Sequence, residues 1–302
     1  MKLACSVRDA SGPSLSACHF LLSRYDERSG FKPDSGESWI YQTEGDDSHA
    51  LRGQGGWYTG LWRSAAGKVY VAFSVGQVLV NPDPRPRVAP WREDPVPGVL
   101  SGVWGLHDEC VFVWGIRGGK NVVYRFDGSK WEELPSPPGE ILAMHGIAPD
   151  LVYAVGRGDL LAHWNGKTWR KVVSPARGVL VDVFIASESE MYAVGSNKQL
   201  LQGSVHGWTE VLEGPGSLYA VAKWKGDVWV GAADHGLMKL DGAKLLPVKP
   251  NIKARRLDAR DELVISSPEM IAGTNDGLTY TAVRAPFLAG AIEKVPFAWG
   301  NP

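Results

Sequence analysis

The sequence predicts an all-β protein made of repeated small sheets, and three observations support this prediction. A short apolar phrase recurs around marker residues at positions 70, 112, 153, 192, 229 and 271, so the intervals are 42, 41, 39, 37 and 42. The chain also holds 13 Trp and 36 Gly, which suits aromatic packing between sheets that are joined by tight turns. A period of about 40 residues is the length of one four-stranded propeller blade. The predicted fold is therefore a β-propeller.

Each repeat divides into four expected strands, and the unit around residue 153 shows the pattern. A continuous apolar run comes first, at 140–144, as expected for a strand buried on both faces. The marker strand Val152–Gly156 comes second and is rich in β-branched and aromatic residues. A third strand at 160–164 leads into Asn165-Gly166, a strong hairpin signal, and Trp169 begins the outer strand.

The ratio of length to period favours seven blades over six. Residues 57–280 contain the clear repeats, residues 1–56 supply a diverged N-terminal blade, and residues 281–302 provide a closing strand. An open ring would leave strand edges exposed, so we expect Phe287–Gly290 and Leu3–Val7 to complete one shared blade. The expected organisation is a single domain that spans residues 1–302.

The repeats resemble those of bacterial β-propeller repeat proteins. Their pattern is YAVG, a glycine turn, then W-N/D-G-x-x-W followed by S-P, and the unit from Val152 to Pro175 matches it with both Trp164 and Trp169. The neighbouring units match in part, with Phe126 and Trp131 in one. This resemblance covers about residues 57–280 and implies a propeller fold, and it transfers no catalytic residue.

Charge and hydropathy narrow the range of partners. The net charge of −1 and the pI of about 6.7 disfavour nucleic acid and anionic membranes. No apolar run approaches the roughly 18 residues of a membrane span, and the N-terminus lacks an apolar segment of signal-peptide length, so we expect a cytoplasmic protein. Cys5, Cys18 and Cys110 match neither a disulfide framework nor a zinc site, and we expect no metal or cofactor.

Motifs of catalytic sites are missing from the sequence. The seven His residues form no His-x-His or His-Glu-x-x-His pattern, and there is no Gly-x-Ser-x-Gly elbow. The turn Asn275-Asp276-Gly277 is only faintly similar to the Asp-box turn of sialidase-type propellers. We therefore predict a protein that is not an enzyme.

Polar turns mark the predicted binding face. In a propeller, the turns after the marker strands and the links between blades lie on one face, and here they mix Arg, Trp and Asp, as protein-binding rims do. The proline-rich stretch 81–97 is expected to join two blades and to contribute to this face. The candidate partner-binding residues are Arg85, Arg87, Trp91, Arg92, Arg117, Lys120, Arg157, Asp159, Arg177, Lys198, Asp234, His235 and Asp276.

The favoured hypothesis is a monomeric propeller that binds one protein partner through this face. A narrower version is an immunity protein that neutralises a bacterial toxin by covering its active site. The alternatives are a lectin-like propeller whose Trp residues stack on sugars, and a hydrolase with its site at the mouth of the channel.

Overall fold

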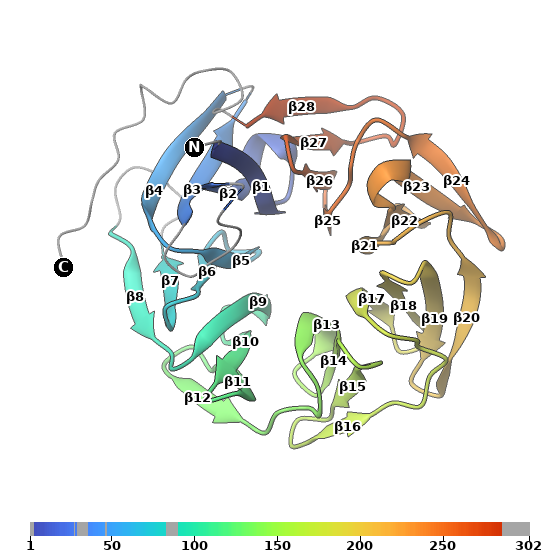
Figure 1. The fold of residues 1–302 in the computed structure, drawn as a ribbon, viewed down its shortest axis with the longest axis horizontal. Coiled ribbons are helices and arrows are strands. Elements are labelled where there is room, and N and C mark those ends of the chain that lie inside the picture. Colours follow the sequence, from blue (N-terminus) through green and yellow to red (C-terminus); the bar gives the residue numbers. More distant parts are fainter. Residues whose placement is uncertain (1–2, 27, 29–35, 46, 83–89, 286–302) are drawn as a thin grey trace. The chain divides into compact units, whose positions relative to one another are not determined.

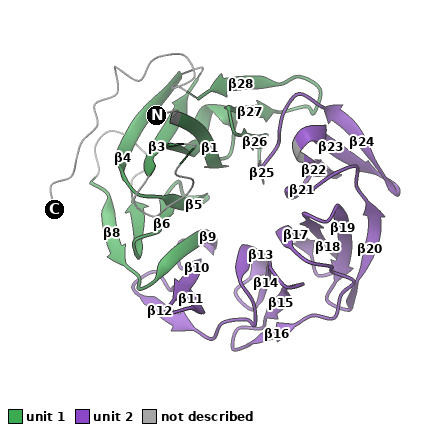
Figure 2. Cartoon of the chain, viewed as in Figure 1, with its two compact units in different colours: residues 1–103, 258–302 green, residues 104–257 purple. Residues whose placement is uncertain are grey.

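A computed structural model shows a β-propeller whose described residues form seven four-stranded antiparallel sheets, one for each blade (Figure 1). The structure describes residues 3–26, 28, 36–45, 47–82 and 90–285. Consecutive strands pair within every blade, so each blade is a simple meander. Within the described ranges, no helix has the length and apolarity that crossing a bilayer requires. The blades fall into two compact units (Figure 2).

The first unit, residues 1–103 and 258–302, holds the first and second blades and most of the seventh. A short 3-10 helix, η1 (Leu15–Ala17), lies between β1 and β2. The strands of these blades are β1 (Leu3–Ser11), β2 (His19–Asp26), β3 (Gly36–Glu44) and β4 (Asp47–Gly55); β5 (Tyr58–Arg63), β6 (Val69–Phe73), β7 (Gln77–Asn81) and β8 (Arg92–Pro95); and β25 (Arg256–Ala259), β26 (Leu263–Ser267), β27 (Met270–Thr274) and β28 (Thr281–Arg284).

The second unit, residues 104–257, holds the fourth, fifth and sixth blades and most of the third. A 3-10 helix, η2 (Ala233–His235), lies between the second and third strands of the sixth blade. The strands are β9 (Val99–His107), β10 (Cys110–Arg117), β11 (Lys120–Phe126) and β12 (Trp131–Leu134); β13 (Ile141–Ala148), β14 (Leu151–Gly156), β15 (Leu161–Trp164) and β16 (Trp169–Lys171); β17 (Leu180–Ser187), β18 (Glu190–Gly195), β19 (Gln199–Ser204) and β20 (Gly207–Glu213); and β21 (Ala220–Trp224), β22 (Asp227–Gly231), β23 (Leu237–Asp241) and β24 (Lys244–Lys249).

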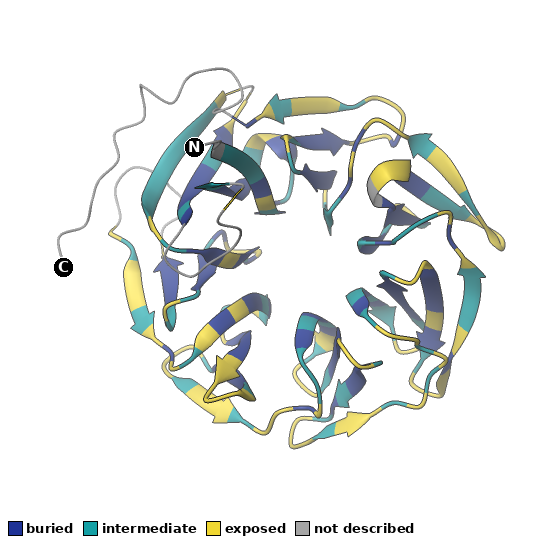
Figure 3. Ribbon diagram, viewed as in Figure 1, coloured by how far each residue is buried: buried dark blue, intermediate teal, exposed yellow. Residues whose placement is uncertain are grey.

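The marker phrase recurs because each copy fills the core between neighbouring sheets. Tyr153 on β14 is 3% exposed and belongs to one apolar cluster with Leu180 and Val183 of β17, in the next blade. Buried residues dominate the second and third strands of the blades, and the fourth strands are largely exposed or half-buried (Figure 3). Burial on both faces therefore explains the near-continuous apolar character of these strands.

The W-N/D-G-x-x-W pattern closes the hairpin between the third and fourth strands. Trp164 and Trp169 are paired in register across β15 and β16, with ring centroids 5.5 Å apart. Between them, the side-chain oxygen of Asn165 accepts hydrogen bonds from the backbone N–H groups of Lys167 and Thr168, at 3.0 and 2.9 Å. Such Asx turns are why Asn or Asp begins the turn.

The seventh blade differs from the expected register. Its marker phrase, residues 270–273, lies on β27, which is the third strand of the blade and not the second. The second strand is β26, which is equally buried along its length, and neither β26 nor β27 has an aromatic residue. The last interval of 42 residues therefore includes a shift by one strand, and the turn that contains Asp276 follows a third strand.

The expected sharing of one blade between the two chain ends is wrong for the N-terminal segment. β1 pairs with β2 along its length as the first strand of its own blade, and the seventh blade is completed by β28. The seventh and first blades instead meet through side chains and backbone: Leu15 N donates to Glu262 Oε2 at 2.8 Å, and Val7 N donates to Pro268 O at 2.8 Å. Phe287–Gly290 lies outside the described residues.

The proline-rich stretch 81–97 is mainly a connection within the second blade. It leads from β7, the third strand, to β8, the fourth. Residues 96–98 alone link this blade to β9, so the expectation that the whole stretch joins two blades is wrong. Proline at the end of β8 is compatible with an outer edge strand, which needs no further ladder donor there.

Candidate partner-binding face

Eight of the predicted binding residues lie at one end of the blades of the second unit. In an antiparallel meander, the turn between the second and third strands and the connection to the next blade emerge at the same end. We call this end the turn face and define it by residues 117–120, 157–159, 175–178, 196–198, 214–218 and 233–236. It carries Arg117, Lys120, Arg157, Asp159, Arg177, Lys198, Asp234 and His235.

The structure places the other predicted residues elsewhere. Trp91 and Arg92 precede or begin β8 and lie, like Asp276, where the third strand of a blade connects to the fourth. Trp91 packs against an apolar cluster of the first unit, and Arg92 Nε is 2.7 Å from Asp94 Oδ1. Arg85 and Arg87 lie outside the described residues.

Asp276 closes its own turn. One carboxylate oxygen accepts hydrogen bonds from the backbone N–H groups of Leu278 and Thr279, both at 2.8 Å, and the other accepts a hydrogen bond from the Thr279 hydroxyl. The Thr279 hydroxyl, followed by these N–H groups, lowers the pKa of Asp276 well below its ordinary value. This carboxylate therefore has a structural use in the seventh blade.

The turns of the turn face are fixed to the connections between blades. Asp159, with a φ of 56°, donates its backbone N–H to Gly178 O at 2.8 Å, and its carboxylate accepts a hydrogen bond from Gly178 N. Asn197 Nδ2 donates to Arg177 O at 2.7 Å, and Gln199 Oε1 accepts from Arg177 N at 2.7 Å. Asp159 therefore joins its turn to the connection between the fourth and fifth blades. The exposed charges beside it are those of Arg157 and Arg177.

The same arrangement recurs between the fifth and sixth blades. Gly214 N donates to Lys198 O at 2.7 Å, and the Ser217 hydroxyl donates to Ser196 O at 2.8 Å. A Cβ at Gly216 would lie 2.9 Å from the imidazole Cδ2 of His235, so glycine lets this ring approach the connection closely. These contacts join the turns of the fourth, fifth and sixth blades to the connections beside them.

Four exposed cations at the turn face are each paired with a glutamate, and Lys120 has no ion pair with a described residue. Arg117 Nη1 also donates a hydrogen bond to the hydroxyl of the buried Tyr124 at 2.8 Å. The cation side chains are 47–61% exposed, so the pairs stay solvated and each contributes at most about 1 kcal/mol to stability. The pairs are Arg117–Glu133 at 2.7 Å, Arg157–Glu140 at 3.2 Å, Arg177–Glu210 at 2.8 Å and Lys198–Glu213 at 3.9 Å.

None of these four glutamates is among the candidate residues from the sequence, and for Glu133 and Glu210 the reason is strand register. They lie on the fourth strands β12 and β20, where Glu133 is in register with Tyr124 and Glu210 with Leu201. The alternation of side chains along the outer strand could have predicted these two positions, because every second side chain of a strand points to the same side. The result is a face of alternating charge, not a basic one.

The strand histidines are built into packing contacts. His145 Nδ1 accepts a hydrogen bond from Ile185 N at 3.1 Å, and its ring lies 4.6 Å from Phe184 and 5.4 Å from Trp104. Burial lowers the pKa of His145 to about 4, so this imidazole is neutral near pH 7. His163 stacks on Tyr153 at 4.9 Å. Among the residues that the structure describes, no group of three or more His, Cys, Asp or Glu is arranged to hold a metal ion.

Comparison with known proteins identifies the fold through structure alone. No protein-family model matches the sequence, and no curated protein matches it either. The WD40 beta propeller domain of Doa1 is similar, with a TM-score of 0.66 at 9% identity over 88% of this chain and 91% of that chain. YCF48 bound to D1 peptide gives 0.63 at 14% identity, over 89% and 90%. Virginiamycin B lyase from Staphylococcus aureus gives 0.62 at 14% identity, over 76% and 84%. At these identities the likeness establishes a propeller fold.

Proposed function

We propose that this chain is a non-enzymatic propeller that binds one protein partner through the turn face. The observation that carries the proposal is the combination of clamped turns with exposed charges of both signs. Loops that are already held in one conformation lose little conformational entropy on binding, which favours affinity. Charges of alternating sign select a partner with the complementary pattern and orient it.

Structures of similar fold support a protein or peptide as the partner. YCF48 is bound to a D1 peptide in its structure, which establishes that a propeller of this kind accommodates a peptide. The virginiamycin B lyase has the same fold and is an enzyme, so fold alone does not separate the two roles. The turn face is our reason to favour binding, because its three Arg residues and Lys198 form ion pairs and Asp159 fixes a turn, so these side chains are already ordered.

A narrower proposal concerns the kind of partner. We infer an immunity protein that acts in the cytoplasm as a monomer and neutralises a toxin domain by covering its active site. A rigid face spread over four blades is broad enough for one protein domain, and toxins that act on nucleic acid often carry basic sites that the exposed glutamates would complement. Genes next to the one that encodes this chain provide a direct check: a toxin gene is expected there.

Charge reversal at the two ends of the same blades tests the proposal. The turn-face variant carries Arg117→Glu, Arg157→Glu and Asp234→Lys. The control variant carries Lys130→Glu, Lys167→Glu and Asp241→Lys, which make the same change in charge at exposed turns between third and fourth strands. Both variants and the wild type are immobilised and used to capture partners from lysate, and each bound protein is identified by mass spectrometry.

We expect a stoichiometric partner on the wild type and the control variant that is absent from the turn-face variant. Surface ion pairs contribute little to stability, so all three proteins should unfold at similar temperatures. Loss of the partner from the control variant alone would place binding at the opposite end of the blades. A glycan array that is bound by the wild type, with no protein captured, would favour the lectin-like alternative.

A further inference from the structure

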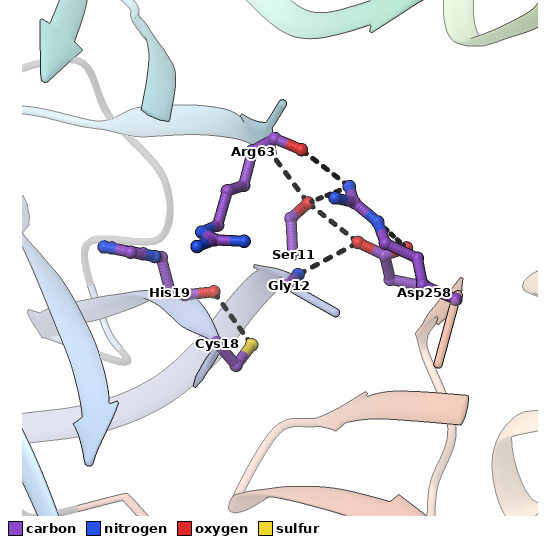
Figure 4. A network of polar contacts seen from close by, with 7 residues as sticks. Ser11, Gly12, Cys18, His19, Arg63 and Asp258 are labelled. Atoms are coloured by element: carbon purple, nitrogen blue, oxygen red, sulfur yellow. Dashed lines mark hydrogen bonds and ion pairs between the residues drawn. The ribbon is translucent and has the colours of Figure 1, made fainter. Parts of the chain in front are cut away.

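The first unit contains a partly buried guanidinium, that of Arg63, for which no described carboxylate serves as a counter-ion. Arg63 is the last residue of β5, and its backbone is fixed by two contacts to neighbouring blades. Its N–H donates to Ser11 Oγ at 3.1 Å, and its carbonyl oxygen accepts from Arg260 Nη2 at 2.7 Å (Figure 4). The ends of β1, β5 and β25 thus meet around this residue.

The carboxylate of this cluster, Asp258, already accepts hydrogen bonds from other groups. Its Oδ1 accepts a hydrogen bond from Arg260 Nε at 2.9 Å, and its Oδ2 accepts from Ser11 Oγ at 2.8 Å and from Gly12 N at 3.0 Å. Arg260 is therefore neutralised by Asp258. No ion pair joins Arg63 to a carboxylate of the described residues, so one positive charge of this cluster stays without a counter-charge.

Two buried polar atoms at this site, one of them in the guanidinium itself, also lack hydrogen-bond partners. Arg63 Nε is one, and His19 Nδ1 is the other, on a side chain that is only 2% exposed. The imidazole of His19 lies next to the guanidinium of Arg63 in Figure 4. Burial, and then the charge of Arg63, lower the pKa of His19 to about 3, so the ring is neutral and can carry its proton on Nδ1 as a donor.

Without a bound anion, the charge of Arg63 and the unpaired donors make an unfavourable contribution to the stability of the fold. A cation that is partly removed from water and lacks a counter-charge is costly, and an unpaired buried donor adds to that cost. Burial, and then the charge of Arg260, lower the pKa of Arg63 by more than the smaller effects of Cys18 and Asp258 raise it. A planar guanidinium with free N–H groups is suited to bind two oxygens of one carboxylate or phosphate.

We propose that Arg63, with His19 as an adjoining donor, binds a compact anion that has at least two terminal oxygens, a carboxylate or a phosphate. Arg63 as a whole residue is partly exposed to solvent. This site belongs to the first unit and is independent of the turn face.

Anion-dependent thermal stability tests this proposal. The unfolding temperature of the wild type is measured in inorganic phosphate, in succinate and in chloride, at equal ionic strength and pH. We expect a saturable rise in phosphate or succinate over chloride, because a ligand that binds only the folded state stabilises it. The anion with the larger rise identifies whether phosphate or carboxylate is the preferred chemistry.

Three variants assign the effect to the cluster. Arg63→Gln should abolish the rise, and Arg63→Lys, which keeps the charge but loses the planar fork, should weaken the apparent affinity about tenfold. Arg125→Gln is the matched control, because Arg125 Nε on β11 is likewise buried without a partner but lies in the second unit; its rise should equal that of the wild type.

An equal rise in wild type and Arg63→Gln, or no rise with either anion, would overturn the proposal. If Arg63→Gln does not fold, the arginine side-chain N–H signals of the wild type supply a second measurement by NMR. A phosphate or succinate titration should then shift one buried Nε–H signal, the one that is missing from Arg63→Lys, and chloride should leave it unchanged. Absence of such a shift would also contradict the site.

Discussion

Single side chains on the first strands join neighbouring blades within each unit. In the first unit, Asp9 Oδ2 accepts a hydrogen bond from Leu61 N at 3.0 Å. In the second unit, Asp182 Oδ2 accepts from Val221 N at 3.0 Å, and His145 Nδ1 takes the same role towards Ile185 N. Different residue types therefore satisfy the same need, which is an acceptor for a backbone N–H of the next first strand. The apolar pattern of the repeat alone does not predict these hydrogen bonds.

Removing the acceptor at Asp182 should destabilise the fold. Asp182→Ala leaves Val221 N–H without its partner, and an unsatisfied buried donor costs about 1–3 kcal/mol. Asp182→Asn keeps an acceptor oxygen and should lose less than half of that amount. Urea unfolding followed by circular dichroism measures both, with the exposed Asp241→Ala as the reference. Equal stability of Asp182→Ala and wild type would show that this hydrogen bond is dispensable.

The buried His145 should make stability depend on pH. Its folded pKa of about 4 lies below the ordinary value of 6.5, so between these values the unfolded chain binds a proton that the folded chain does not. The free energy of unfolding should therefore fall as the pH is lowered from about 6.5 to about 4, by at most about 3 kcal/mol from this group.

Replacing His145 checks the origin of that pH dependence. His145→Gln keeps a side chain that can accept a hydrogen bond but has no proton to gain, so its stability should fall less steeply over the same pH range. His19, whose pKa burial lowers to about 3, leaves a residual slope. His206→Gln, at an exposed turn, serves as the control and should keep the slope of the wild type. An unchanged slope in His145→Gln would contradict this assignment.

At the scale of strands, pairs of aromatic and glycine residues organise the outer edge of a blade. Trp208 on β20 is in register with Gly203 on β19, and a Cβ at Gly203 would lie 2.1 Å from the indole Cδ2. The indole therefore lies flat over the glycine, and the same relation holds for Trp39 and Gly53 in the first unit. The outer strand is held by this contact as well as by its ladder of hydrogen bonds.

A side chain at Gly203 should displace Trp208. Gly203→Val is expected to destabilise the protein by about 2 kcal/mol, because the indole must leave its position in the core. Gly55→Ala is the control, since a Cβ there meets no atom within 4 Å. Denaturant unfolding gives the stability, and near-ultraviolet circular dichroism reports the environment of the Trp residues. A stable Gly203→Val variant with an unchanged spectrum would exclude the proposed packing.

The sequence predicts the strands best in blades where only the second strand has the marker pattern. In the fourth blade, the marker phrase and the hairpin signal agree with β14 and with the turn between β15 and β16. In the seventh blade, both β26 and β27 are short buried apolar strands, so an apolar pattern cannot tell which of them is second. The same ambiguity misplaced Asp276, because a shift by one strand exchanges the two ends of a blade.

The candidate site was predictable to a similar extent. Turns that follow second strands gather at one end of the blades by topology, which is why residues such as Arg157 and Lys198 lie on the turn face. Their partners Glu140 and Glu213 adjoin those turns, but Glu133 and Glu210 required the register between third and fourth strands. The cluster around Arg63 depended on contacts between residues about 50 to 250 positions apart in sequence, which no local motif records.

For the whole molecule, the propeller supplies two separate candidate sites. The turn face belongs to the second unit, and the Arg63 cluster belongs to the first. The single-domain organisation of the chain stays a prediction. A propeller positions loops from several blades, but the fold assigns no chemical role to any of them. The turn residues, and not the fold, therefore determine the ligand.

Calorimetry with the purified partner tests the central claim most directly. The affinity is measured for the wild type, for the turn-face variant Arg117→Glu/Arg157→Glu/Asp234→Lys, and for the control variant Lys130→Glu/Lys167→Glu/Asp241→Lys. Binding through the turn face predicts one-to-one stoichiometry, a loss of at least about tenfold in affinity for the turn-face variant, which is about 1.4 kcal/mol, and nearly unchanged affinity for the control. Equal affinities for the turn-face variant and the wild type would contradict the account.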